Sequence, residues 1–326
     1  MKVLVADKFE KSGLDGLKGL GVDVVYEPDL KDASLKDALA SSKADVLVVR
    51  STKVTAEMIE APELSVIIRA GAGYNTIDVA AASQRGILVT NCPGKNSQAV
   101  AELAFGLILA CDRRIPDNVI QLREGKWNKK EFGKAKGLYG RTLGLIGMGK
   151  ISQEMIARAK AFGMTVMVYS RWMTPDVAAA LGISRAETLD DIARMSDVVS
   201  VHVSLTKESR GMLGASFFDA MKPGATFVNT SRAEVVDQAA MLAAAKAKGL
   251  RLVLDVFEGE PAGRRRIMTA RSVRRGPIAR TISGRARTRL RRRWRRRSFV
   301  SCASTRTRGS CRTWSMLGMR RLRRTC

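Results

Sequence analysis

The stretch TLGLIGMGKISQEMIARAKAFG, residues 142–163, decides the fold class of this protein. An apolar segment runs straight into Gly147 and Gly149, and an amphipathic pattern follows. A glycine loop between a strand and a helix makes a tight turn, lets a backbone approach a pyrophosphate, and aims helix N–H groups at it. We therefore predict a dinucleotide site at Gly147, Gly149, Lys150 and Ile151, with a plain glycine turn as the alternative. Ser152 stands in place of the usual third glycine.

Short β-branched runs alternate with alanine-rich amphipathic stretches on both sides of this loop. Such alternation predicts α/β architecture with two Rossmann-like, doubly wound parallel sheets. We expect a first domain over residues 1–96, a dinucleotide-binding domain over 97–263 that opens with a long helix at 97–115, and a disordered arginine-rich tail over 264–326. The predicted strands are 2–6, 22–26, 45–50, 65–69, 87–91, 142–147, 165–169, 197–203, 225–230 and 251–257, with helices near 9–19, 33–41, 55–61 and 77–84 between the first five.

The adenosine end of the predicted cofactor site carries no acid. A carboxylate usually ends the second strand of such a fold and binds the ribose hydroxyls. Here the strand is followed by Ser170 and Arg171, which cannot repel a 2′-phosphate and offer a cation to pair with one. The cofactor prediction is therefore NAD(P), with NADP(H) tolerated. An ordinary exposed arginine at a strand end is the alternative.

The charge of the chain is concentrated at one end. The formal net charge is +26, yet residues 264–326 hold 23 arginines and no lysine, aspartate or glutamate. One interpretation is a basic arm for nucleic acid or an acidic membrane surface. The other is a GC-rich coding sequence translated in the wrong frame, since such codons yield mostly arginine. We favour the second, so a nucleic-acid partner is expected only if the tail is genuine.

Several classes of protein are disfavoured by the rest of the sequence. The longest apolar run, residues 103–111, is too short to cross a bilayer, and residues 1–10 do not resemble a secretory signal. The five cysteines have neither zinc-site nor disulfide-framework spacing. We expect a cytoplasmic protein with no membrane association and no metal.

Residues 1–261 resemble the D-isomer-specific 2-hydroxyacid dehydrogenases. The resemblance rests on motifs that follow one another in the family's order, namely VRSTKVT (49–55), IRAGAGYNTIDV (68–79), NCPGKNSQAVAE (91–102), LGLIGMGKI (143–151), FVNTSRAEVVD (227–237) and DVFEGEP (255–261). It implies a substrate domain joined to a cofactor domain, a homodimer, and hydride transfer between a nicotinamide cofactor and a small D-2-hydroxy acid. Within the family the motifs are most similar to the branch that acts on 3-phosphoglycerate in serine synthesis.

The resemblance also assigns roles to particular positions. Arg232 matches the arginine that binds the substrate carboxylate and C2 oxygen, and Glu260 matches the carboxylate that orients a catalytic histidine. The N–H groups of Ala72 and Gly73 are expected to receive the substrate carboxylate. Thr230 and Asp255 match positions that contact the cofactor. Independently of the resemblance, Arg50 and Arg69 end adjacent predicted strands facing the loop at 70–75 and could hold a substrate phosphate, with Ser51 as a further substrate-binding candidate. For the two arginines, ordinary surface residues at strand ends are an equal alternative.

The family's catalytic histidine has no counterpart in this sequence. The resemblance places it about twenty residues beyond Glu260, where the chain reads IARTISGRART (278–288). The single histidine, His202, falls in a predicted strand and is expected to be a packed residue. Because proton transfer to and from the 2-hydroxyl needs such a group, a dinucleotide-binding protein without turnover is the main alternative to an active dehydrogenase.

Overall fold

The computed structural model describes residues 1–258 and 301–302. The described chain divides between Asn96 and Ser97 into two units, each with its own sheet. Residues 259–300 and 303–326, which include Glu260 and nearly all of the basic tail, lie outside the described residues.

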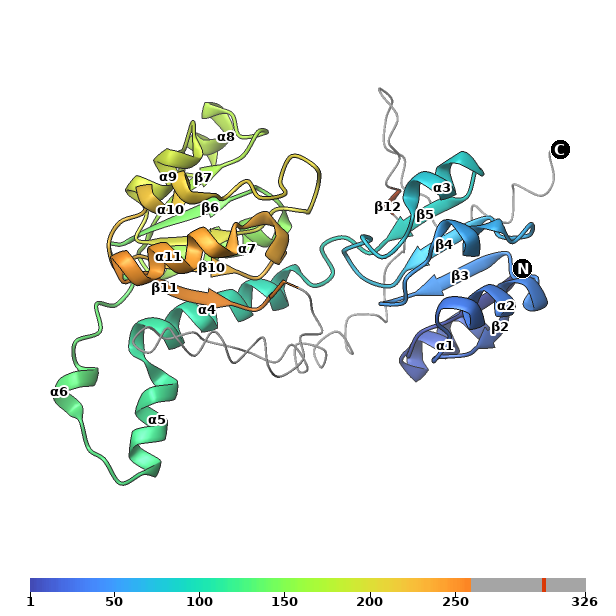
Figure 1. The fold of residues 1–326 in the computed structure, drawn as a ribbon, viewed down its shortest axis with the longest axis horizontal. Helices are drawn as coiled ribbons and strands as arrows, with labels where there is room; N and C mark the ends of the chain where they lie inside the picture. The colour runs from blue at the N-terminus through green and yellow to red at the C-terminus, as the bar shows by residue number, and fades with distance from the viewer. Residues whose placement is uncertain (259–300, 303–326) are drawn as a thin grey trace. The chain divides into compact units, whose positions relative to one another are not determined.

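The first unit is a doubly wound sheet (Figure 1). Its five parallel strands lie in the order β5-β4-β3-β1-β2, and a two-residue strand, β12 (Ser301–Cys302), pairs antiparallel with β5. Successive strands are added toward one edge of the sheet from β1 to β2 and toward the other edge from β3 onward, so the winding reverses between β1 and β3. The elements are β1 Lys2–Val5, α1 Lys11–Lys18, β2 Asp23–Tyr26, α2 Asp32–Ser42, β3 Val46–Val49, the 3₁₀ helix η1 Ala56–Glu60, β4 Val66–Arg69, α3 Val79–Gln84 and β5 Leu88–Asn91.

Alternation along the strands of this unit fills both faces of the sheet. Val3 and Val5 point to the face covered by Leu14 and Leu17 of α1, whereas Leu4 joins the core under α2, η1 and α3. Successive side chains of a strand project to opposite faces. A sheet covered by helices on both sides therefore needs the nearly continuous apolar strands that the sequence contains.

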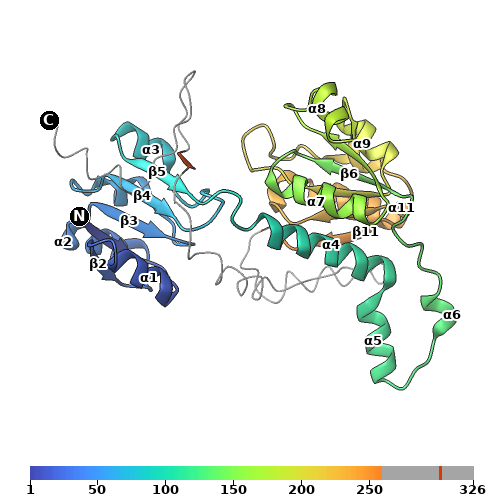
Figure 2. The same ribbon diagram turned by 180° about the vertical axis from the view of Figure 1, so that it is seen from behind.

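The second unit has six parallel strands in the order β11-β10-β9-β6-β7-β8 (Figure 2). With β6 counted as strand 1 and the sheet read from β8, this is the order 3-2-1-4-5-6 of dinucleotide-binding folds. The winding reverses between β6 and β9. The elements are α4 Ser97–Arg113, α5 Ile115–Arg123, α6 Lys129–Phe132, β6 Thr142–Ile146, α7 Lys150–Ala161, β7 Thr165–Tyr169, α8 Pro175–Ala180, β8 Ser184–Arg185, α9 Leu189–Met195, β9 Val198–Val201, α10 Ala215–Ala220, β10 Thr226–Asn229, η2 Ala233–Val235, α11 Gln238–Lys248 and β11 Arg251–Leu254.

The long helix predicted at 97–115 is broken near its end. α4 stops at Arg113, Arg114 takes a left-handed φ of 51°, and α5 starts at Ile115. Pro116 lacks the N–H that a continuous helix would direct at the carbonyl of Asp112, and its ring would crowd that carbonyl, whereas proline is tolerated in the first turn of a new helix. Arg114 is held in this corner by ion pairs to Asp117 at 3.1 Å and Glu131 at 2.7 Å.

α4 packs within the second unit. Ala101, Phe105 and Ile108 lie in one core cluster with Met155 and Ala159 of α7. The opposite face of the same sheet is covered by α9, α10 and α11. Among the described residues, no helix is both long and apolar enough to span a membrane.

Candidate functional site: the reversal points of the two sheets

The glycine loop of the second unit lies at the β6/β9 reversal. Gly147 has a φ of +99°, and a Cβ at this position would lie 2.6 Å from the carbonyl oxygen of His202, which follows β9. The Gly147 N–H donates to the carbonyl of Tyr169 at 2.8 Å, at the end of β7. Only glycine fits here, because both the positive φ and the close approach exclude a side chain.

Gly149 differs from Gly147 in an informative way. Its φ is −86°, and among the described residues an added Cβ would meet no atom within 4 Å beyond its chain neighbours. The protein's own packing therefore does not require glycine at this position. It is the N-cap of α7 and offers no capping side chain, so the first-turn N–H groups of Lys150 and Ile151 are left for an anion at the positive end of the helix. Open space beside these donors fits a pyrophosphate.

Ser152 replaces the third glycine without filling that space. It is fully buried, and its hydroxyl donates to the carbonyl of Gly147 at 2.8 Å. Ile151 packs on the core of the unit. The Ser152 hydroxyl thus stabilises the glycine loop from its buried side.

Ser170 and Arg171 lie directly after β7, as predicted. Ser170 is partly buried and accepts a weak hydrogen bond from the N–H of Trp172 at 3.4 Å, while Arg171 is exposed. The hydroxyl of Thr206, and more weakly the charge of Arg171, hold the pKa of Glu208 below its ordinary value. The loop after β9 therefore brings one carboxylate within electrostatic reach of Arg171, which local sequence did not indicate.

The ends of β10 and β11 carry Arg232, Thr230 and Asp255. Asn229, only 2% exposed, accepts from the N–H of Ser231 at 3.0 Å and donates to the carbonyl of Arg232 at 2.9 Å. Sequence reasoning missed this role of Asn229. The Arg232 guanidinium donates to the carbonyl of Ser231 at 2.8 Å.

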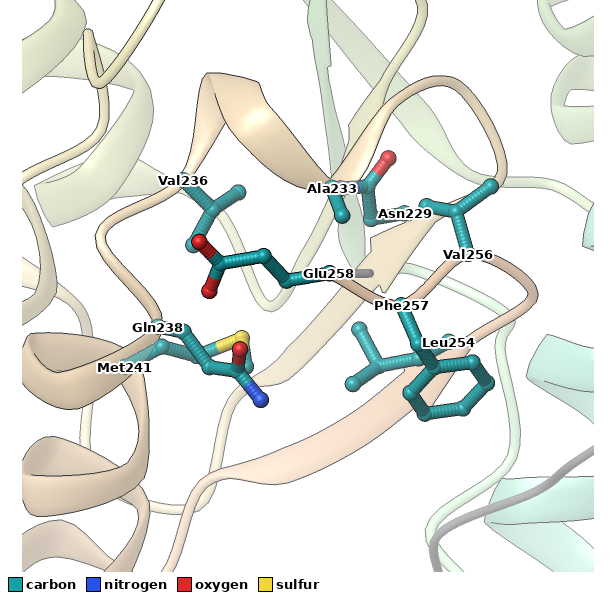
Figure 3. A pocket seen from close by; sticks show the side chains of 9 residues that line it. All are labelled: Asn229, Ala233, Val236, Gln238, Met241, Leu254, Val256, Phe257 and Glu258. Atoms are coloured by element: carbon teal, nitrogen blue, oxygen red, sulfur yellow. The ribbon is translucent and has the colours of Figure 1, made fainter. Parts of the chain in front are cut away.

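The cofactor-side residues sit at the same edge. In the described structure the buried hydroxyl of Thr230 has no hydrogen-bond partner, and Asp255 continues the β10–β11 ladder through its N–H to the carbonyl of Asn229 at 3.0 Å. A buried polar group without a protein partner is suited to a ligand. Figure 3 shows a shallow pocket beside these strand ends, with the carboxylate of Glu258 lying between Val236 and Gln238.

In the first unit, Arg50 and Ser51 follow β3 at the β1/β3 reversal. Val49 pairs with Arg69 in the β3–β4 register, so the two arginines stand at the carboxyl ends of neighbouring strands. Asp7, which follows β1, accepts hydrogen bonds from the N–H groups of Arg50, Ser51 and Thr52. The sequence signal that could have revealed Asp7 is a lone acid two residues beyond a buried strand.

The loop after β4 keeps Ala72 and Gly73 available. The carbonyl of Ala72 accepts from the Asn91 amide at 2.7 Å, whereas the N–H groups of Ala72 and Gly73 donate to no other group in the described part of the chain. Gly71 makes room for Arg69, since a Cβ there would lie 1.6 Å from its guanidinium nitrogen. Two free donors beside a guanidinium fit a carboxylate.

His202 is a packed residue. It is 9% exposed, its Nε2 lies 2.9 Å from the Ser200 hydroxyl, and burial lowers its pKa to about 4. It lies one residue beyond β9 rather than inside it. Among the described residues no group of three histidine, cysteine, aspartate or glutamate side chains could hold a metal.

Comparison with known proteins agrees with this geometry. Residues 105–277 match the D-isomer specific 2-hydroxyacid dehydrogenase, NAD binding domain. The chain is 40% identical over 264 residues to the D-3-phosphoglycerate dehydrogenase of Methanocaldococcus jannaschii, covering 80% of this chain. This chain therefore belongs to the D-isomer-specific 2-hydroxyacid dehydrogenase family.

Two further relatives place it within that family. It is 45% identical over 222 residues to the hydroxypyruvate reductase of Thermotoga maritima, covering 67% of this chain and 71% of the relative. Its fold is similar to the holo form of Rhodotorula graminis D-mandelate dehydrogenase, with a TM-score of 0.76, 28% identity and 86% of each chain covered. The chain spans about half the length of the phosphoglycerate dehydrogenase it matches.

Proposed function

We propose that this protein is an NAD(P)-dependent oxidoreductase that transfers a hydride between a nicotinamide dinucleotide and a small D-2-hydroxy acid. The observation that carries the proposal is the space at Gly149, open beside the uncapped N-terminus of α7. Gly149, Lys150 and Ile151 would hold the pyrophosphate, and Thr230 and Asp255 the nicotinamide side. The bound dinucleotide supplies the hydride acceptor or donor.

We propose 3-phosphoglycerate as the substrate, at the start of serine synthesis. Oxidation of its C2 removes a hydride and the hydroxyl proton, and reduction reverses both. Arg232 binds the carboxylate and the C2 oxygen, where a permanently charged donor stabilises developing negative charge. The N–H groups of Ala72 and Gly73 receive the carboxylate, and Arg50 and Arg69 receive the phosphate.

We propose that the chain with this sequence catalyses hydride transfer only slowly. Its one histidine, His202, is buried behind the glycine loop and stays neutral, because burial lowers its pKa to about 4. Loss of a positioned acid/base costs roughly 10²–10⁴ in rate. Glu260, the position matched to the carboxylate that orients the family's catalytic histidine, lies outside the described residues. A dinucleotide-binding protein without turnover is the second candidate function, favoured by this missing histidine.

The experiment separates binding from chemistry. NADH binding is measured by fluorescence titration, and reduction of 3-phosphohydroxypyruvate, hydroxypyruvate and glyoxylate is then followed at saturating NADH. We expect saturable binding and the highest kcat/KM for the phosphorylated keto acid. Absence of NADH binding would refute the proposal, a preference for hydroxypyruvate would refute the substrate, and binding with no hydride transfer would establish the second candidate.

We further propose that NADP(H) binds at least as well as NAD(H). Ser170 and Arg171 support this, because no acid follows β7 and the exposed guanidinium of Arg171 can pair with a 2′-phosphate. The carboxylate of Glu208 would repel a 2′-phosphate, but it belongs to a different loop, the one after β9.

We also propose a homodimer formed through α5. Figures 1 and 2 show α5 and α6 extending away from the sheet of their unit. α5 has no buried residue, and Ile115, Val119, Ile120 and Leu122 are exposed on it. A nine-residue helix is not stable by itself in water, so an apolar stripe on such a helix favours a partner, here a second copy.

The free thiols of Cys92 and Cys111 support a cytoplasmic location.

A further inference from the structure

A single buried carboxylate organises the reversal point of the first sheet. Asp7 is 9% exposed. Its Oδ2 accepts from the N–H groups of Arg50 at 2.6 Å, Ser51 at 3.0 Å and Thr52 at 3.0 Å, and its Oδ1 accepts from the Ser51 hydroxyl at 3.1 Å. Four donors that lie more than forty residues away along the chain therefore converge on one side chain.

The carboxylate of Asp7 is kept ionised in this position. Burial by itself raises its pKa, but the N–H donors of Arg50, Thr52 and Ser51 outweigh burial and hold the pKa below its ordinary value. Hydrogen bonds to the charged form favour that form. The turn after β3 is thus pinned by a fixed negative charge.

This arrangement decides which groups can recognise an anion at the edge of the sheet. Successive backbone N–H groups in a turn often form a concave anion site. Here the protein's own carboxylate occupies those of residues 50–52, and the Ser51 proton as well. Recognition of a ligand anion is left to the side chains of Arg50 and Arg69, which leave neighbouring strands.

We propose that Asp7 is a positioning residue for the phosphate of the substrate. It fixes the backbone at Arg50, so that the guanidinium groups of Arg50 and Arg69 can bind one phosphate together. It also occupies the Ser51 hydroxyl, which is then not available to a ligand. The inference rests on the proposed function, because it assigns the phosphate of that substrate to Arg50. Asp7 acts through Arg50 and touches no substrate atom itself.

The chain offers a matched control for this idea. Asp45 joins the same two strands at their opposite, amino-terminal ends, where it accepts from the N–H of Lys2 at 2.7 Å. Asp45→Asn therefore weakens another β1–β3 contact, made by one N–H group instead of four donors, at the end of the strands opposite the proposed phosphate site. If Asp7 serves stability alone, the two asparagine variants should behave alike.

The test is calorimetric binding of 3-phosphoglycerate and of D-glycerate to the full chain saturated with NADH. We expect Asp7→Asn to weaken 3-phosphoglycerate binding roughly tenfold, as for loss of a charge-assisted contact, and to change D-glycerate binding less than twofold. Arg50→Gln should show the same pattern, and the double variant should be no weaker than Arg50→Gln, because the two act in one chain of contacts. Asp7→Glu should recover most of the affinity, and Asp45→Asn should bind like the unmodified protein.

Several outcomes overturn the inference. They are unchanged 3-phosphoglycerate binding in Asp7→Asn, equal weakening of both ligands, or additive effects of the two substitutions. If Asp7→Asn does not fold, Ser51→Ala removes one donor with little strain and should weaken 3-phosphoglycerate binding about twofold; unchanged binding there also counts against the inference. If the unmodified chain binds NADH but neither acid, the proposed function fails, and the role of Asp7 fails with it.

Discussion

The carbonyl oxygen of His202 lies 2.6 Å from the point where Gly147 would carry a Cβ. These residues follow the two strands between which the second sheet reverses direction. The protein's own backbone thus closes one side of the glycine loop, whereas the space at Gly149 stays open. The two glycines of one motif are needed for different reasons, and substitution separates them.

Gly147→Ala should destabilise the fold, and Gly149→Ala should spare it. The first adds a methyl group against the His202 carbonyl at a positive φ, at a cost of about 2–4 kcal/mol. The second should change the free energy of unfolding by less than about 1 kcal/mol, yet weaken NADH binding at least tenfold. Urea unfolding and fluorescence titration check this. If Gly149→Ala binds NADH as tightly as the unmodified protein, the cofactor site is not at this loop.

Ser170→Asp should shift the cofactor preference toward NAD(H). A carboxylate after β7 repels a 2′-phosphate and binds the ribose hydroxyls instead. We expect the ratio of NADPH to NADH affinity to fall by about tenfold or more, equivalent to ~1.4 kcal/mol. Ser170→Asn is the uncharged control. If the unmodified protein already rejects NADPH a hundredfold, our interpretation of Ser170 and Arg171 is wrong.

Stability should fall in acid because of His202. Its pKa is about 4 in the folded chain against 6.5 for an ordinary histidine, so the unfolded state binds the extra proton between these values. The stabilisation is complete above pH 6.5, is lost as the pH falls toward 4, and totals about 3 kcal/mol. Denaturant unfolding from pH 7.5 to 4.5 measures it. His202→Gln should flatten this part of the pH profile, and an unaltered slope would contradict the assignment.

Hydride transfer should depend on sequence beyond codon 263. We expect another reading frame there to encode TPH or a close variant, followed by an alanine-rich amphipathic helix. A gene restored to that frame should gain roughly 10²–10⁴ in kcat, and Arg232→Gln in the restored protein should abolish the gain. Nucleotide sequencing and a coupled assay check both points. If no alternative frame is open, the basic tail needs a functional explanation, and steeply salt-dependent binding to DNA would supply one.

Charges on the exposed stripe of α5 should convert a dimer to a monomer. Val119→Glu combined with Leu122→Glu places carboxylates where a partner helix would bury apolar side chains. Sedimentation analysis should give a monomer with intact NADH binding. Gln121→Glu on the same helix is the control and should remain dimeric. A monomeric unmodified protein would refute the dimer.

Local patterns in the sequence were enough to predict much of this fold. The run into Gly147 and the helix after it, the alternation of apolar strands with amphipathic helices, and the positions of Ser170 and Arg171 after β7 all depend on neighbouring residues. The structure confirms the two doubly wound sheets and corrects the helix at Arg114, where Pro116 ends the hydrogen-bond pattern.

What only the tertiary structure decided are the contacts between distant strand ends. Asp7 binds residues 50–52, and the His202 carbonyl closes on Gly147, because β1 lies beside β3 and β6 beside β9. Asn229 differs from these two, because its hydrogen bond to the carbonyl of Arg232 is a local contact between residues three apart in the loop after β10. Hydrophobic periodicity shows that a segment is a strand and which faces it buries, but not which strand lies next to it. Asp7, which sequence reasoning missed, is a site residue whose role depends on such a neighbour.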